Sequence, residues 1–144
     1  MDGSNNKITL EYNIMQNDFK CAGEASSNVK KILNQLGIDS KIVRRAAIAT
    51  YEAEMNIVIH SLGGKIIVTI TSDVIEIKAH DRGPGIKDIE LAMQEGYSTA
   101  SNLVRELGFG AGMGLPNMKK CSDIFNIISR ENEETLVSMK IYIK

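Results

Sequence analysis

Two glycine-rich segments constrain the fold of this chain more than any other feature of its sequence. Residues 81–85 read DRGPG, and residues 108–114 read GFGAGMG, with a glycine at every second position. A glycine within a helix or strand costs about 0.5–1 kcal/mol, so such a run indicates special backbone dihedral angles or a close approach to a ligand. Residues 115–120 then favour a helix, since Pro116 is tolerated in a first turn. A glycine loop before a helix N-terminus presents free N–H groups and a partial positive charge, which suits a nucleotide polyphosphate.

The size and charge of the chain argue against several classes of protein. Its 144 residues fit a single domain, residues 1–144. A net charge of −1 without a basic block is unlike that of nucleic-acid-binding proteins, and no apolar run approaches the roughly 20 residues of a membrane span. The polar N-terminus lacks a signal-peptide pattern, and Cys21 and Cys121 lack metal-binding spacing. We expect a cytoplasmic protein with free, reduced cysteines and no nucleic-acid or membrane partner.

Hydrophobic periodicity predicts about five strands and three principal helices. Strands are expected at residues 7–14, 66–71, 74–80, 124–128 and 136–143. A first helix begins at a cap at Asp18 and ends at Gly37, and a second begins at Asp39 or Ser40 and ends near Ser61. The third is the helix that follows the second glycine-rich segment.

Strands that are adjacent in the sequence favour a sheet built from hairpins. Residues 66–71 and 74–80 are joined by a short turn, and the acidic residues 131–134 separate the last two strands. Such pairs predict an α+β two-layer sandwich, in which a mostly antiparallel, mixed sheet carries its helices on one face. Residues 88–94 fit a short helix, whereas residues 95–109 show no firm periodicity.

The second helix carries two polar residues four positions apart, Glu52 and Asn56. They lie one above the other at the edge of an apolar stripe. The stripe comprises Ile48, Tyr51, Met55, Val58, Ile59 and Leu62. One interpretation of the pair is a solvated helix flank. The other is a glutamate that polarises a water or hydroxyl beside an asparagine that gives one oxygen to Mg²⁺.

Asp81 is a third candidate site residue, because it directly follows a predicted strand. Alternation along residues 74–80 puts Asp81 on the inward face, with Ile75, Ile77 and Ala79. A buried carboxylate requires a hydrogen-bond donor, and an exocyclic amine such as N6 of adenine would supply one. The alternative for this segment alone is a polar turn with permissive glycines. The presence of all the motifs in this order favours the nucleotide site.

The ordered set of motifs resembles the GHKL ATPases, which include gyrase, Hsp90, histidine-kinase and MutL relatives. The motifs are Glu52-x-x-x-Asn56, Asp81-x-Gly83-x-Gly85 and Gly110-x-Gly112-x-Gly114. Within this family the chain is most similar to the small bacterial anti-sigma-factor and switch serine kinases of the RsbT and RsbW type. The similarity is greatest to the RsbT branch over residues 81–119, and the resemblance extends over about residues 7–144. It implies the Bergerat-type ATP-binding fold.

The resemblance also implies a role for each motif. Asn56 matches the Mg²⁺-binding asparagine of the family, and Glu52 matches the glutamate proposed as general base in its kinases. Asp81 matches the aspartate that bonds adenine, while Gly83 and Gly85 let the base and its water approach the backbone.

The resemblance places an ATP lid at about residues 95–109. Ser98 and Thr99 fall where members of the family keep hydroxyls on the phosphate side, and Arg105 lies in the same lid. The residues implied to bind the phosphates are Gly108, Gly110, Gly112, Met113 and Gly114.

The function implied by the resemblance is an ATP-dependent protein serine/threonine kinase whose acceptor is a small STAS-domain antagonist. Phosphorylation would add close to two negative charges and break the complex, which would free the kinase for a sigma factor or a phosphatase. Two alternatives stay open: a non-catalytic, ATP-dependent anti-sigma binding module and, with less support, a GHKL ATPase subunit. Whether the chain forms a homodimer also stays open.

Overall fold

Five segments with alternating apolar side chains pair into one sheet. The computed structural model describes residues 7–82, 93, 114–129 and 134–143. The strands are β1 (Ile8–Ile14), β2 (Gly64–Ile70), β3 (Val74–Asp81), β4 (Ile124–Ser129) and β5 (Thr135–Tyr142). They lie in the order β1-β2-β3-β5-β4, and each neighbouring pair is antiparallel. The predicted strands and the mostly antiparallel sheet are confirmed.

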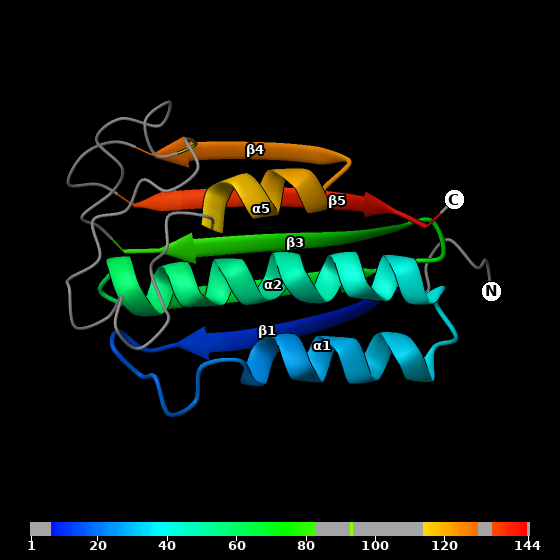
Figure 1. Cartoon of the computed structure of the whole chain (residues 1–144), viewed down its shortest axis with the longest axis horizontal. Helices are drawn as coiled ribbons and strands as arrows, with labels where there is room; N and C mark the ends of the chain where they lie inside the picture. The colour runs from blue at the N-terminus through cyan, green and yellow to red at the C-terminus, as the bar shows by residue number, and fades with distance from the viewer. Residues whose placement is uncertain (1–6, 83–92, 94–113, 130–133, 144) are drawn as a thin grey trace.

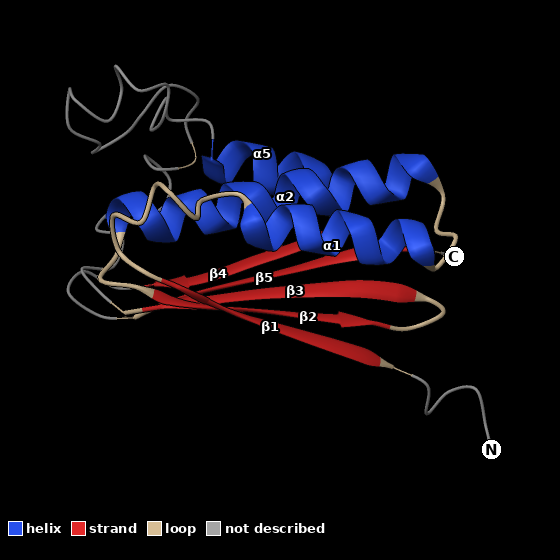
Figure 2. Ribbon diagram, turned by 90° about the horizontal axis from the view of Figure 1, so that it is seen from below, coloured by secondary structure: helices blue, strands red, loops and turns tan. Residues whose placement is uncertain are grey.

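Helices cover one face of this sheet, as Figure 2 shows. Within the described residues they are α1 (Glu24–Gln35), α2 (Ser40–His60) and α5 (Gly114–Cys121). α2 lies in the middle and contacts both α1 and α5 (Figure 1). The predicted start of α2 is confirmed, because the Asp39 side chain accepts a hydrogen bond from the Lys41 N–H. The α+β two-layer sandwich is therefore confirmed.

The predicted cap of the first helix was wrong. Asp18 accepts a hydrogen bond from the Cys21 N–H at 3.2 Å and stabilises the turn before α1 rather than the helix itself. α1 begins after Gly23, which has a φ of 98° and no side chain that could serve as a cap. The predicted end is confirmed, since Gly37 has a φ of 74° and its N–H donates to the Asn34 carbonyl.

The apolar stripe predicted for α2 was only partly right. Met55 and Val58 are buried, but Tyr51 and Leu62 are 38% and 59% exposed. Other buried positions along α2 carry smaller side chains: Val43, Ala46, Ala49, Thr50 and Ala53. Because α2 packs against two helices and the sheet, small residues permit the close approach that large ones would prevent.

The hydrophobic core fills the space between the helices and the sheet. From the sheet it takes the inward side chains of Ile66, Val68, Ile70, Ile75, Ile77, Ala79, Val137, Met139 and Ile141. The same alternation continues to Asp81, which is 7% exposed. The predicted inward orientation of Asp81 is confirmed, and it occupies the last core-facing position of β3.

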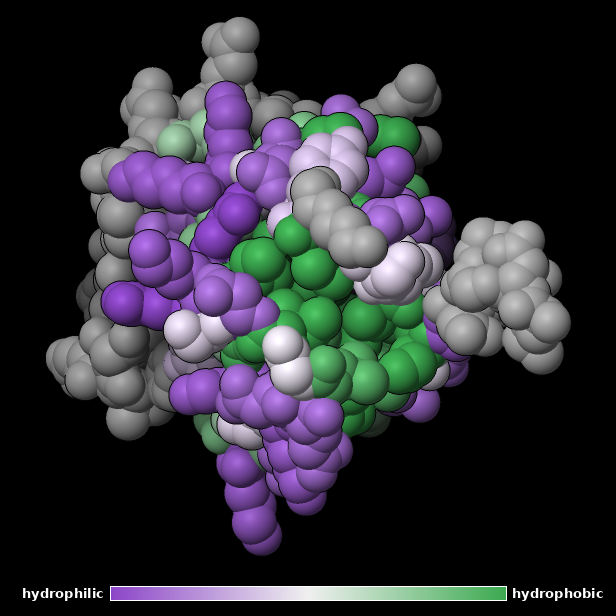
Figure 3. All heavy atoms as spheres, turned by 90° about the vertical axis from the view of Figure 1, so that its right-hand side faces the viewer, coloured by the Kyte–Doolittle hydropathy of each residue, from purple (hydrophilic) through white to green (hydrophobic). Residues whose placement is uncertain are grey.

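Apolar side chains also reach the surface at the end of the sandwich where β1 begins and α1 ends. Figure 3 shows this end as a hydrophobic area with a polar rim. Ile8 and Leu36, which lie at these two element ends, are 37% and 46% exposed. No helix among the described residues is long and apolar enough to cross a membrane. Cys21 and Cys121 are free thiols.

Candidate functional site

Three described segments meet at the other end of the sandwich. They are the C-terminal half of α2, the C-terminal end of β3 and the N-terminal end of α5 (Figure 1). α2 contacts both α5 and β3. These segments bring four of the residues predicted from the sequence to one end of the molecule: Glu52, Asn56, Asp81 and Gly114.

Glu52 is hydrogen-bonded across the helix layer to Asn117. The Asn117 Nδ2 donates to Glu52 Oε2 at 2.7 Å, in partly buried surroundings. Asn117 lies in the first turn of α5, between the buried side chains of Pro116 and Met118. The sequence analysis missed Asn117. The only signal for it was its position three residues after the last glycine of the second glycine-rich segment.

Asn56 lies one helical turn beyond Glu52, on the same side of α2. It is partly exposed, and its amide has no hydrogen-bond partner among residues 7–82, 93, 114–129 and 134–143. None of the described residues therefore occupies the amide oxygen, which is of the type that binds hard cations. The same part of the chain holds no group of three or more His, Cys, Asp or Glu side chains that could bind a metal by themselves. A cation such as Mg²⁺ would therefore need phosphate oxygens and water as further ligands.

Asp81 has an unusual protonation equilibrium for an aspartate. Burial raises its pKa from 3.8 to about 6, and a hydrogen bond from the Thr135 backbone only partly offsets that rise. The charge of His80 also lowers the pKa, while that of Glu134 raises it. Near neutral pH the carboxylate is ionised but poorly solvated, which favours an additional hydrogen-bond donor from a ligand. Such an acceptor fits an amine like that of adenine.

Gly64 sets the position of Asp81 from the neighbouring strand. The two residues are directly paired between β2 and β3. A Cβ atom on residue 64 would lie 2.4 Å from the His80 carbonyl oxygen and 2.8 Å from Asp81 Cα. Both are backbone atoms, so they could not move without a shift of β3. Only glycine at position 64 allows this pairing.

Glu54 is a second carboxylate on α2 that the sequence analysis did not single out. It is 2% exposed, and its two oxygens accept hydrogen bonds from the N–H groups of Ala25 at 3.2 Å and Ser26 at 3.4 Å. These are N–H groups that the first turn of a helix leaves unpaired. Burial raises the pKa of Glu54, and the N–H groups partly offset the rise. Glu54 thus caps α1, while Glu52 faces α5.

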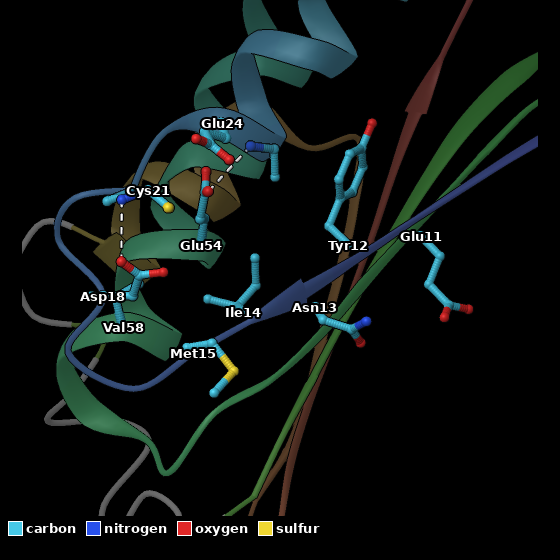
Figure 4. A pocket seen from close by; sticks show the side chains of 12 residues that line it. Glu11, Tyr12, Asn13, Ile14, Met15, Asp18, Cys21, Glu24, Glu54 and Val58 are labelled. Carbon is cyan, nitrogen blue, oxygen red and sulfur yellow. Dashed lines mark hydrogen bonds between the residues drawn. The ribbon is translucent and has the colours of Figure 1, made fainter.

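A pocket of about 250 Å³ lies beside Glu54. Figure 4 shows the side chains around it, which come from β1, from the loop that precedes α1, from the start of α1 and from α2. Its acidic lining residues are Glu11, Asp18, Glu24 and Glu54. Glu52, Asn56 and Asp81 do not line it. The pocket is therefore separate from these three described residues of the predicted nucleotide site.

The remaining predicted site residues lie outside the described part of the chain. These are Gly83, Gly85, Ser98, Thr99, Gly108, Gly110, Gly112 and Met113. The predicted lid at residues 95–109, including Arg105, also lies there, as does the short helix at residues 88–94 apart from Met93. Their roles stay predictions.

Comparison with known proteins agrees with the arrangement of the described elements. Residues 17–141 match the histidine kinase-like ATPase domain. The serine/threonine-protein kinase RsbT of Bacillus subtilis is 32% identical over 122 residues, which cover 82% of this chain and 84% of RsbT. An anti-sigma F factor of Thermoanaerobacter sp. is 33% identical over 144 residues, which cover 93% of this chain and 97% of that protein.

A solved structure has a similar fold. A chain in the crystal structure of the SiaB–SiaC complex from Pseudomonas aeruginosa superposes with a TM-score of 0.56 at 11% sequence identity. The match covers 92% of this chain and 89% of that chain. At this identity the likeness concerns the fold alone.

Proposed function

Because the chain belongs to the histidine kinase-like ATPase domain family, we propose that it is an ATP-dependent protein serine/threonine kinase. Its acceptor in this proposal is a small STAS-domain partner. The hydrogen bond that orients Glu52 beside the start of α5 carries the proposal, because it holds a carboxylate next to the predicted phosphate-binding segment. The similarity to a named serine/threonine kinase over most of both chains supports it.

Three residues hold the nucleotide in this proposal. Asp81, in its ionised form, accepts a hydrogen bond from N6 of adenine. The backbone at Gly114, at the N-terminus of α5, faces the phosphates. Asn56 supplies one oxygen to Mg²⁺. A bound Mg²⁺ neutralises negative charge on the β- and γ-phosphates.

Glu52 is the general base. Its Oε2 accepts from Asn117, while no described residue donates to its Oε1. We assign to Oε1 the proton of the acceptor serine or threonine hydroxyl. The hydroxyl oxygen forms a bond to the γ-phosphorus, the bond from that phosphorus to the β,γ-bridging oxygen breaks, and ADP leaves. Positioning dominates such a reaction, so a small set of residues is sufficient.

A non-catalytic, ATP-dependent anti-sigma module is the second candidate. The similarity to an anti-sigma F factor over nearly the whole chain favours it. In that case the protein binds its partner in the presence of ATP and transfers no phosphate. Nothing in the described residues favours the third possibility, an ATPase subunit of a larger assembly.

Phosphate transfer tests the proposal. The protein is incubated with γ-labelled ATP, Mg²⁺ and each purified STAS-domain protein of the same organism. We expect transfer to a serine or threonine of one of them. Glu52→Gln should abolish the transfer, whereas Glu76→Gln should not, because the ion pairs of Glu76 with described residues are long ones to its sheet neighbours Lys78 and Lys140. Stable binding of a partner without any phosphate transfer would contradict the kinase proposal and support the anti-sigma module instead.

A further inference from the structure

We propose that Asn117 is a positioning residue for Glu52, and that it connects the general base to the start of α5. This inference rests on the proposed kinase function. No described residue other than Asn117 donates a hydrogen bond to the Glu52 carboxylate. Asn117 does not touch the reacting atoms in this scheme. It acts on them through the orientation of Glu52.

The packing of α5 fixes the place of the Asn117 side chain. Leu115 and Met118, on either side of it, are 6% and 0% exposed and belong to the hydrophobic core. These contacts set the rotation of α5 about its axis. Asn117 has a short side chain, so its amide reaches only the adjacent surface of α2. The 2.7 Å contact with Glu52 follows from this placement.

A second polar contact holds the far end of α5 against α2. The Arg45 Nε donates to the Cys121 carbonyl at 3.0 Å, and its Nη2 lies 3.0 Å from Asp123 Oδ1. α5 is therefore fixed to α2 at its C-terminal end without any help from Asn117. The hydrogen bond from Asn117 to Glu52 therefore does more than anchor α5 to α2.

The chemistry of the pair suits a general base. A neutral amide orients a carboxylate without adding the positive charge of a lysine or arginine partner, which would stabilise the ionised form more strongly. Asn117 lies three residues after Gly114 on one short helix. A displacement of the first turn of α5, where phosphate is proposed to bind, would therefore also displace the Glu52 carboxylate.

Two substitutions separate positioning from folding. Asn117→Leu keeps a side chain of similar size but removes the donor. We expect kcat for phosphate transfer to fall about 10- to 100-fold, with KM for ATP and the thermal midpoint close to wild type. The control is Lys119→Ala, on an exposed position of the same helix, and it should change neither constant. Unchanged kcat in Asn117→Leu, or an equal loss of ATP binding, would overturn the inference.

Asn117→Asp gives a readout that a merely structural role would not produce. It places two carboxylates within hydrogen-bond distance, so one of them retains a proton to higher pH than usual. A protonated Asp at position 117 can donate to Glu52 as the amide does. We expect this variant to recover activity relative to wild type as the pH is lowered, and to lose it as the pH rises. A pH–rate profile parallel to that of wild type would contradict the inference.

The pair can also be observed without nucleotide. In nucleotide-free protein, the side-chain ¹⁵N–¹H signals of Asn117 should move in Glu52→Gln relative to wild type and stay in place in Glu76→Gln, because the amide donates to Glu52. Asn117 signals that are unchanged in Glu52→Gln would overturn the inference. A wild-type protein that transfers no phosphate would overturn the proposed function and this inference with it. An active wild type with a fully active Asn117→Leu would overturn this inference alone.

Discussion

Gly64 and Asp81 face each other across β2 and β3 at a separation that leaves no room for a Cβ atom on residue 64. The proposed adenine-binding carboxylate thus depends on a residue that would never touch the nucleotide. Asp81 is held from the other side by Thr135, its partner on β5. The carboxylate is fixed between two strands before any ligand binds.

Gly64→Ala should displace Asp81. The new methyl group would meet backbone atoms of β3, and such overpacking costs about 1–3 kcal/mol of unfolding free energy. ATP affinity, measured by calorimetry, should fall as well. Gly37→Ala is the control: its φ of 74° strains alanine, but no atom of the described residues lies within 4 Å of a Cβ there. It should lose stability and keep its ATP affinity. Equal affinity in the two variants would contradict the role given to Gly64.

The raised pKa of Asp81 predicts that stability falls with rising pH. The folded value is about 6 against an ordinary value of 3.8, so the folded state binds more protons than the unfolded state between these values. The free energy of unfolding should therefore decrease from about pH 4 to pH 6, by at most about 3 kcal/mol from this residue. Denaturation at several pH values measures it.

Asp81→Asn isolates this contribution from that of Glu54. Burial raises the pKa of Glu54 as well, so Glu54 contributes a pH dependence of the same sign. Asp81→Asn should therefore lose only the Asp81 share of the pH dependence of the free energy of unfolding, and it should keep the share of Glu54. Identical pH dependence in the two proteins would show that Asp81 is not buried in its ionised form.

Asn56→Ala should change the response of ATP binding to magnesium. In the proposal, Asn56 gives one oxygen to Mg²⁺, whereas Asp81 binds the base. Calorimetry with and without Mg²⁺ should therefore show a Mg²⁺-dependent gain in affinity for wild type that Asn56→Ala lacks. Asp81→Asn should weaken binding under both conditions. If Mg²⁺ strengthens ATP binding equally in wild type and Asn56→Ala, Asn56 is not the metal ligand.

Glu54→Ala should destabilise the protein through α1. It would leave the N–H groups of Ala25 and Ser26 without their buried acceptor and create a cavity, at a cost of about 2–4 kcal/mol. Glu54→Gln keeps one acceptor oxygen and should lose less. Urea denaturation measures both. A loss of stability from Glu54→Ala no larger than that from Glu11→Ala, at an exposed position of β1, would exclude the capping role.

The strands and the orientation of Asp81 could be predicted because alternation is a local property. In a strand with one buried face, side-chain direction follows from parity alone. That parity carries from Ile75 to Asp81 without knowledge of any partner strand. The end of α1 was predictable for a similar reason, since a glycine of positive φ is a local signal.

The contacts of the two glutamates on α2 could not be predicted in this way. Glu52 and Glu54 are two residues apart, and both border apolar positions. Their roles differ only because α5 packs on one side of α2 and α1 on the other. The one signal in the sequence is Gly23, which precedes α1 and has no side chain that could cap it. The N–H groups of the first turn then need an acceptor from another element.

The most direct test of the kinase assignment is a single-turnover measurement of γ-phosphate transfer to the STAS-domain partner by Glu52→Gln and Glu54→Gln, side by side with wild type. The two substitutions are chemically identical and lie two residues apart on one helix. We expect phosphoserine or phosphothreonine on the partner with wild type and with Glu54→Gln, and none with Glu52→Gln. Transfer by Glu52→Gln at the wild-type rate would contradict the assignment of Glu52 as the general base of this site.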